Sequence, residues 1–193
     1  QNRIRALPTE LRRIVGKVWF PHDNGQALIN AIRSGARVYG VSDGSASRGS
    51  ATHGWKLARG PADPLAIKGC GPVDGHLPSA FRAEMQGQLA VLIVSSLLVA
   101  ARRIRKANIV SLCDNRATLR RMAEHSRNLR VRDHTESEVD LYLIYRDWIQ
   151  KQHVQCESKW VKGHQDRHKL IQDIDDEGLL NMEVDRLATL AYT

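Results

Sequence analysis

The sequence has few aromatic residues, few cysteines and no hydrophobic run long enough to suggest a membrane span. Only 5% of its 193 residues are aromatic, so its core must be mostly aliphatic. None of the three cysteines (Cys70, Cys113, Cys156) lies in a Cys-x-x-Cys or Cys/His cluster, which disfavours a disulfide framework and a structural zinc site. The most apolar stretch, residues 89–101, is 13 residues long and too short to cross a bilayer. We therefore expect a globular protein with no membrane partner in an intracellular, reducing compartment, nuclear or cytoplasmic.

The start of the chain differs in character from the rest. It begins with Gln1 rather than Met, and no signal-peptide pattern follows, so we interpret the chain as a piece of a longer protein. Residues 11–18 and 26–32 carry short amphipathic helical patterns. Because so short a segment buries too little surface to fold alone, we expect residues 1–34 to be a helical lead-in or linker and residues 35–193 to form the main domain.

Positive charge is concentrated in one segment. Lys and Arg number 29 against 21 Asp and Glu, a formal net charge of +8. Residues 102–132 contain ten basic and two acidic residues, so their local charge equals that of the whole chain. A concentrated basic surface favours a polyanion partner, with nucleic acid the first choice. A solvated helix face is the alternative that charge alone leaves open. Residues 173–177 form an acidic run instead.

Hydrophobic periodicity predicts a mixed α/β domain after residue 35. Three β-rich stretches joined by short turns rich in Gly, Ser and Pro predict an antiparallel meander. Later segments alternate between strand and helix periods, which is typical of parallel strands connected by helices. The predicted strands are residues 36–42, 51–58, 65–73, 108–113 and 154–161, and the predicted helices are residues 80–103, 116–125, 136–152 and 180–192. We therefore predict a five-stranded mixed sheet flanked by helices.

Four carboxylates occupy positions that this fold would bring together. Asp43 and Asp114 are predicted to end strands. Glu84 lies near the start of the long apolar helix, and Asp185 lies early in the last one. Because the carboxyl ends of parallel strands meet at one edge of a sheet, we expect these side chains to cluster there. Clustered carboxylates repel one another unless a cation neutralises them, and hard oxygen ligands select Mg²⁺ or Mn²⁺.

Each carboxylate taken singly is more often a turn, cap or solvated residue, so the prediction rests on the ordered set. Five motifs carry that order: Val-Ser-Asp43-Gly-Ser, Ser-Ala-Phe-Arg-Ala-Glu84-Met, Val-Ser-Leu-Cys-Asp114-Asn, Trp-Val-Lys-Gly-His164-Gln-Asp and Asn-Met-Glu-Val-Asp185-Arg-Leu-Ala. Together they resemble the type 1 ribonuclease H family, and most closely the ribonuclease H domains attached to retroelement reverse transcriptases. The resemblance covers residues 36–193, about four fifths of the chain.

The resemblance implies a ribonuclease H-like fold and a specific activity. Members of this family hydrolyse the RNA strand of RNA–DNA hybrids with two Mg²⁺ ions held by an Asp-Glu-Asp-Asp set, Mn²⁺ being a possible substitute. Carried over motif by motif, this set comprises Asp43, Glu84, Asp114 and Asp185, with His164 as the catalytic loop histidine. The resemblance also implies an RNA–DNA hybrid as substrate and a covalently linked reverse transcriptase in a parent polyprotein. The predicted substrate-binding residues are Gly44, Ser45, Arg82, Asn115 and Lys162.

The loop after His164 is long, with 20 residues before Asp185. It contains His168, a second and weaker candidate for the loop histidine, and the acidic run, which we expect to face solvent. Two other function classes remain open. One is a catalytically inactive ribonuclease H-like module that binds nucleic acid. The other is a transposase, integrase or exonuclease on the same scaffold, which we rank lower because such enzymes lack the combined His164 loop and Asn-x-x-x-Asp185 ending.

Overall fold

The computed structural model describes residues 2–47, 49–73, 78–101, 104, 107–125, 138–151 and 156–191. Its helices, strands and short 3₁₀ turns are α1 (Asn2–Arg5), α2 (Thr9–Val15), β1 (Lys17–Trp19), α3 (Gln26–Arg33), β2 (Val38–Ser47), β3 (Ser50–Ala58), β4 (Ile67–Pro72), α4 (Ala80–Ala101), β5 (Ile109–Cys113), α5 (Arg116–His125), α6 (Val139–Lys151), β6 (Cys156–Trp160), η2 (Gln165–Arg167), η3 (Ile171–Asp173) and α7 (Asp176–Leu190). Much of the basic segment 102–132 lies outside the described residues, which include three of its arginines, Arg116, Arg120 and Arg121.

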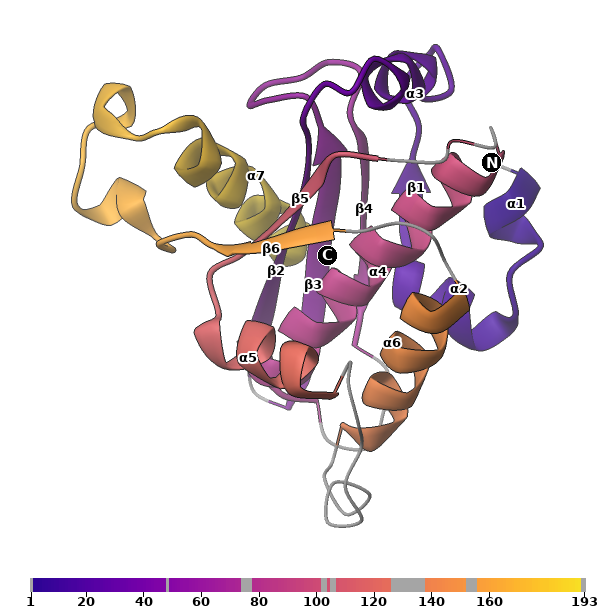
Figure 1. Ribbon diagram of the computed structural model, residues 1–193. Helices are drawn as coiled ribbons and strands as arrows, with labels where there is room; N and C mark the ends of the chain where they lie inside the picture. The colour runs from indigo at the N-terminus through magenta and orange to yellow at the C-terminus, as the bar shows by residue number, and fades with distance from the viewer. Residues whose placement is uncertain are drawn as a thin grey trace.

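One mixed sheet organises the molecule (Figure 1). Its strand order is β1-β4-β3-β2-β5-β6. Strands β1 to β4 pair antiparallel, whereas β2, β5 and β6 run parallel to one another. The predicted meander followed by parallel strands is therefore correct. The sheet has six strands rather than the predicted five, because residues 17–19 add a strand at the β4 edge.

That added strand corrects the expected helix over residues 11–18. Helix α2 ends at Val15, and Gly16 follows with a φ of 71°, a left-handed conformation that glycine adopts without steric cost. A Cβ at this position would lie 2.4 Å from the Cys70 carbonyl oxygen, so the close approach of the chain to β4 also requires glycine. The chain then turns into β1, whose pairing with β4 could not be read from local helical periodicity.

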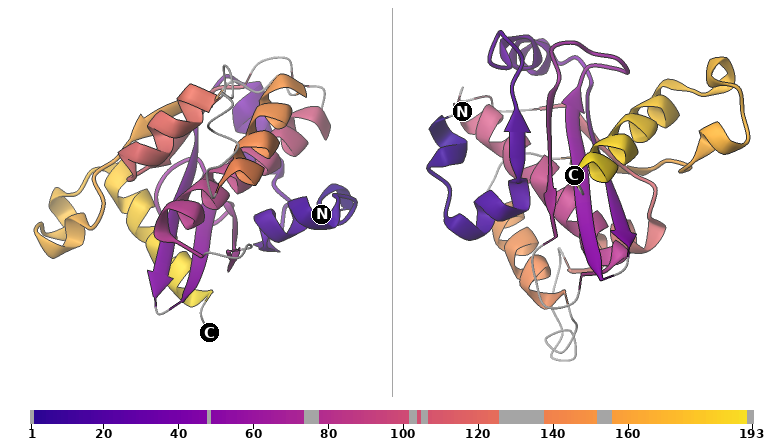
Figure 2. Two further views of the ribbon diagram at one scale, coloured as in Figure 1. Left: turned by 90° about the horizontal axis from the view of Figure 1, so that it is seen from below. Right: turned by 180° about the vertical axis from the view of Figure 1, so that it is seen from behind.

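Helices cover both faces of the sheet (Figure 2). On one face α4 packs with α2 and α3 in a core that includes Trp55, Leu89 and Ile93. On the other face α7 packs through Val184 and Leu187. Helix α4 is long and apolar enough to span a membrane by length and composition, and 83% of that apolar window is buried inside the protein. Here it is the central core helix, because its apolar side chains pack inside the domain.

Residues 1–34 contribute directly to this core. Ile14, Val15 and Leu28 are buried within the same cluster as α4. The indole Nε1 of Trp55 donates a 2.8 Å hydrogen bond to the Val15 carbonyl, which ties the end of α2 to the middle of β3. The lead-in therefore packs on the main domain, and a division of the chain at residue 35 stays a prediction.

A histidine is buried between β3 and the lead-in. His53 is fully buried, and neither ring nitrogen has a hydrogen-bond partner within the described part of the chain. Burial lowers the pKa of His53 from 6.5 to about 4, an effect that the neighbouring Ile14 backbone opposes only in part. The folded state thus favours the neutral imidazole. Its contribution to stability is complete above about pH 6.5 and is lost as the pH falls toward 4.

We expect acid to destabilise the protein through His53. Because His53 stays largely neutral in the folded state and becomes protonated in the unfolded state, lowering the pH from 7 to 4.5 should reduce the free energy of unfolding by about 2 to 3 kcal/mol. In His53→Gln this contribution should disappear, so the variant should lose less stability than wild type over the same range. Urea unfolding at the two pH values measures the difference, with exposed His168→Gln as the matched control. Equal losses in His53→Gln and wild type would contradict the prediction.

Candidate active site

The register of the parallel strands places two of the predicted carboxylates level with each other. Val41 of β2 is paired with Leu112 of β5, so Asp43 and Asp114 lie two residues further along adjacent strands. The prediction that Asp43 ends its strand is wrong. Strand β2 continues to Ser47, because it remains paired with β3 as far as the hairpin turn.

Helices α4 and α7 supply the other two carboxylates. The Ser79 hydroxyl accepts a 3.0 Å hydrogen bond from the Arg82 backbone N–H and so caps the start of α4. Gly44 lets this helix approach β2 closely, because a Cβ there would lie 2.6 Å from the backbone nitrogen of Glu84. Asp185 lies on α7, from where its charge raises the pKa values of both Asp43 and Asp114.

Burial and mutual repulsion raise the pKa values of this carboxylate cluster. Asp43 and Glu84 are only 4% and 5% exposed. Burial first, and then the charge of Asp114, raises the pKa of Asp43 to about 7. Burial and the charges of Asp43 and Asp114 raise the pKa of Glu84 well above its ordinary value. The pKa of Asp114 is also raised, mainly by burial, although His164 and Asn181 oppose the shift. Within the described residues, the positive charge of His164 offsets this repulsion only in part.

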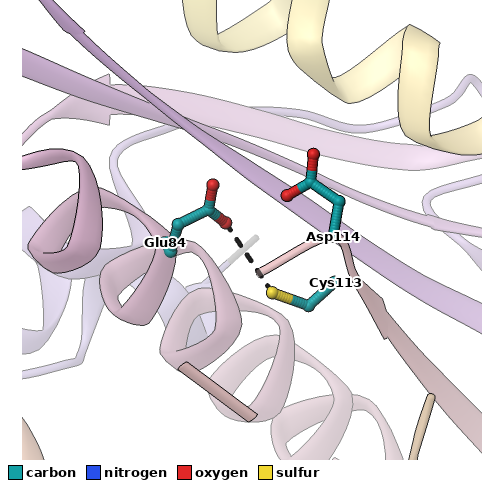
Figure 3. Close-up of side chains that lie close together, drawn as sticks. All are labelled: Glu84, Cys113 and Asp114. Atoms are coloured by element: carbon teal, nitrogen blue, oxygen red, sulfur yellow. Dashed lines mark hydrogen bonds between the residues drawn. The ribbon is translucent and has the colours of Figure 1, made fainter. Parts of the chain in front are cut away.

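Cys113 contributes a thiol to the same cluster (Figure 3). Its Sγ lies 3.7 Å from Glu84 Oε2, and donor atoms of Glu84, Cys113 and Asp114 all lie within 4.8 Å of one another. Cys113 contacts Glu84 of α4, whereas Asp114 also interacts with Asn181 of α7. The closeness of Glu84 to Cys113 could not be read from the sequence, because it depends on how α4 packs on β5.

Asn181 is a second site residue that the sequence analysis did not select. Its side chain is buried and hydrogen bonds to Asp114, which favours the ionised carboxylate. Its Oδ1 has no hydrogen-bond partner within the described residues. The signal was present in the spacing, because Asn181 lies four residues before Asp185 and therefore on the same face of α7.

Asp114 is enclosed by the β6 end of the sheet. A Cβ on Gly163 would lie 2.2 Å from Asp114 Oδ2, so a larger residue there would force this carboxylate to move. The Trp160 indole Nε1 donates a 2.9 Å hydrogen bond to the Asp114 backbone carbonyl. Trp160 is 38% exposed, and the guanidinium of Arg116 lies 3.8 Å from its ring centroid. Trp160 thus lies on the sheet edge rather than in the core, whereas Trp55 is a core residue.

The loop histidine lies next to the cluster. His164 is exposed, adopts a left-handed φ of 49° and begins the turn η2, and its charge lowers the pKa of Asp114. Gln165 anchors the loop through a 3.1 Å hydrogen bond from its Nε2 to the Lys162 carbonyl. His168 follows η2 at its C-terminal end, four residues after His164.

The acidic run serves mainly to begin α7. Asp175 Oδ1 accepts a 2.8 Å hydrogen bond from the Gly178 backbone N–H and so caps the helix. Glu177 forms a 2.7 Å ion pair with Lys159 of β6. Asp173, Asp175 and Asp176 are exposed, in keeping with the expected solvent-facing run. The helix begins at Asp176, one turn earlier than the predicted residue 180, because of this cap.

The predicted substrate-binding residues lie in different environments. Ser45 is partly exposed and Lys162 is exposed. Asn115 Oδ1 accepts a 3.1 Å hydrogen bond from the Thr118 backbone N–H at the start of α5. Arg82 is buried, and its guanidinium forms a two-pronged ion pair with Asp140 of α6. In this structure Arg82 links two helices, and Gly44 packs against α4, so substrate contacts of these residues stay predictions.

Comparison with known proteins identifies the fold. No family model and no curated protein sequence matches the chain. Among solved structures, the chain is similar to RNase H1 from the halophilic archaeon Halobacterium salinarum, with a TM-score of 0.54 and 16% identity over 81% of this chain and 98% of that one. It is also similar to the N-terminal RNase H domain of a Mycobacterium tuberculosis protein, solved as a fusion with maltose binding protein, with a TM-score of 0.48 and 18% identity over 80% of this chain and 92% of that one. The first likeness shows a ribonuclease H-like fold, as predicted.

Proposed function

We propose that this chain is a metal-dependent endonuclease that hydrolyses the RNA strand of RNA–DNA hybrids. The observation that carries the proposal is the convergence of Asp43, Glu84, Asp114 and Asp185, from four separate elements, at one edge of the sheet. A structural cluster would pair such carboxylates with cations of the protein, whereas Asp43 Oδ2 is buried without a hydrogen-bond partner within the described residues. The ribonuclease H-like fold supports the same proposal, as does the resemblance of the five sequence motifs to the ribonuclease H family.

The donor set fits divalent cations. Carboxylate oxygens are the ligands that Mg²⁺ and Mn²⁺ prefer. Burial and mutual repulsion raise the pKa values of Asp43 and Glu84, and a bound cation would offset that repulsion. We propose that Asp43, Glu84, Asp114 and Asp185 hold two such ions. When bound, divalent ions supply the positive charge that stabilises the attacking and leaving oxygens of a phosphodiester.

Other groups of the protein lie beside this site and can assist catalysis or bind the substrate. His164 lies beside Asp114 on an exposed loop, where an imidazole can take a proton from, or give one to, a reacting phosphate. The start of α5, which Asn115 caps, suits a substrate phosphate, because the N-terminal end of a helix carries partial positive charge. Arg120 on the same helix is exposed and adds positive charge near that phosphate.

We also propose the biological setting that the sequence predicted. The chain would be part of a retroelement polyprotein, covalently linked to a reverse transcriptase, which would supply the RNA–DNA hybrid. It would act in an intracellular, reducing compartment.

Digestion of labelled duplexes tests the activity. We expect the chain with Mg²⁺ to cut the RNA strand of an RNA–DNA hybrid and to leave double-stranded DNA and double-stranded RNA intact, because the cut strand must offer 2′-hydroxyl groups. Asp43→Asn serves as the inactive control. Equal cutting of double-stranded DNA would overturn the hybrid assignment. Tight hybrid binding without cutting would favour the inactive nucleic-acid-binding module.

Replacement of the loop histidine should slow the reaction without abolishing it. His164→Ala should lower the rate by about 10²-fold, the lower end of the range for general acid–base catalysis. Because the residue lies on an exposed loop, steady-state turnover should fall more than the first turnover in a rapid-quench experiment. The matched control is His168→Ala, four residues away, which should have little effect. If His168→Ala slowed cleavage and His164→Ala did not, His168 rather than His164 would be the catalytic loop histidine.

A further inference from the structure

A thiol in a carboxylate cluster changes which metal ions the cluster can select. Oxygen ligands suit Mg²⁺, whereas a cysteine sulfur favours softer ions such as Zn²⁺ and Cd²⁺. Cys113 is fully buried at the end of β5, with its Sγ 3.7 Å from Glu84 Oε2 (Figure 3). Donor atoms of Glu84, Cys113 and Asp114 lie within 4.8 Å of one another. Three candidate ligands of mixed hardness therefore surround one point.

The spacing matches tetrahedral zinc coordination. A Zn–S bond of about 2.3 Å and a Zn–O bond of about 2.0–2.2 Å at the tetrahedral angle place sulfur and oxygen about 3.5–3.7 Å apart. Cys113 Sγ lies 3.7 Å from Glu84 Oε2, and the thiol donates a hydrogen bond to this carboxylate. These two donors therefore need almost no movement, and the Asp114 carboxylate needs a small side-chain adjustment to complete three ligands.

An unpaired buried oxygen points to a ligand at the same place. Asp43 is 4% exposed, and its Oδ2 has no hydrogen-bond partner within the described residues. The carboxylate of Asp43 interacts electrostatically with Glu84, Asp114 and Cys113. Its Oδ1 is already occupied by the Gly44 backbone N–H at 2.8 Å, so Oδ2 is the oxygen left to meet a cation.

We propose that Cys113, Glu84 and Asp114 form a binding site for a thiophilic divalent ion, Zn²⁺, with Asp43 beside it. The thiol proton passes to solvent as the Zn–S bond forms. Its consequence for activity rests on the proposed function, because Glu84 and Asp114 are two of the carboxylates assigned to the Mg²⁺ ions. A zinc ion held by Cys113 would occupy them and inhibit hydrolysis. Cys113 would thus make this nuclease sensitive to zinc.

Cadmium binding tests the site without measuring activity. We would use the full chain carrying Cys70→Ser and Cys156→Ser, so that Cys113 is its single thiol, and titrate it with Cd²⁺ while recording the sulfur-to-cadmium charge-transfer absorption. We expect one saturating equivalent, an affinity weakened by about 10-fold to 100-fold or more in Glu84→Gln, and no band in Cys113→Ser. Circular dichroism confirms folding, and Cys113→Ala replaces the serine variant if that fails to fold. An absent band, or an affinity unchanged by Glu84→Gln, would overturn the proposal.

Zinc inhibition tests the consequence. With Mg²⁺ at a fixed concentration, we would measure the Zn²⁺ concentration that halves hybrid cleavage, each variant being compared with its own zinc-free rate. The value should rise by about 10-fold or more from the single-thiol protein to its Cys113→Ser derivative. Equal values would overturn inhibition through Cys113. If no variant cleaves the hybrid, the proposed function fails, while the cadmium titration still decides the metal site.

Discussion

Asp43→Asn should lower the rate of hybrid cleavage in Mg²⁺ by about 10³-fold or more. The substitution keeps the size of the side chain and removes one carboxylate from the set proposed to hold the metal ions, and loss of metal charge stabilisation costs several kcal/mol in the transition state. Asp43 is buried beside Glu84, so an amide fits the same space. Single-turnover cleavage of a labelled hybrid at saturating enzyme measures the effect on the chemical step.

The same variant should be more stable than the wild type when no metal is bound. The pKa of Asp43 is raised to about 7 in the folded state, so the stability that goes with its protonated form is present below its ordinary pKa and is lost as the pH rises toward 7. At pH 8 the buried charge opposes folding, and the neutral amide removes it. We expect Tm to rise by about 3 to 8 °C in chelator, with a smaller gain at pH 5.

Asp173→Asn provides the matched control for both measurements. Asp173 is exposed at the end of η3, so its amide should change neither cleavage nor Tm. A near wild-type rate for Asp43→Asn would refute the two-metal interpretation. A Tm below that of the wild type at pH 8 would show that Asp43 is satisfied by a partner in the folded protein.

Gly163→Ala should lower cleavage by about 10²-fold, because a misplacement of catalytic groups by about 1 Å can cost that much. The added Cβ would lie 2.2 Å from Asp114 Oδ2, closer than any allowed contact, so the carboxylate must move. The atom it meets is the end of a side chain rather than backbone, so the fold should tolerate the change. Steady-state cleavage together with Tm separates the two effects.

Gly60→Ala is the matched control for this prediction. A Cβ at Gly60 would meet nothing within 4 Å, so the same chemical change should leave cleavage unaffected. If Gly163→Ala retains full activity, Asp114 either has room to rotate without loss or is not a ligand. A large fall in Tm would instead assign Gly163 to the stability of the β6 end of the sheet.

The order of strands and helices after residue 35 could be predicted from the sequence, because it depends on local periodicity and turn residues. Ser79 as a cap and α4 as the core helix follow from short-range rules of this kind. The set of four carboxylates was also predictable, since their motifs lie at strand and helix positions that this topology brings to one edge.

Other features depended on which distant segments pair and pack. Strand β1 exists because residues 17–19 find the free edge of β4, which no local pattern encodes. Strand β2 continues beyond Asp43 because β3 pairs with it as far as Ser47. Cys113 entered the site because α4 presents Glu84 to the same side of β5. Local chemistry thus specified the candidate ligands of this protein, whereas the register of the sheet and the packing of α4 and α7 decided which groups surround them.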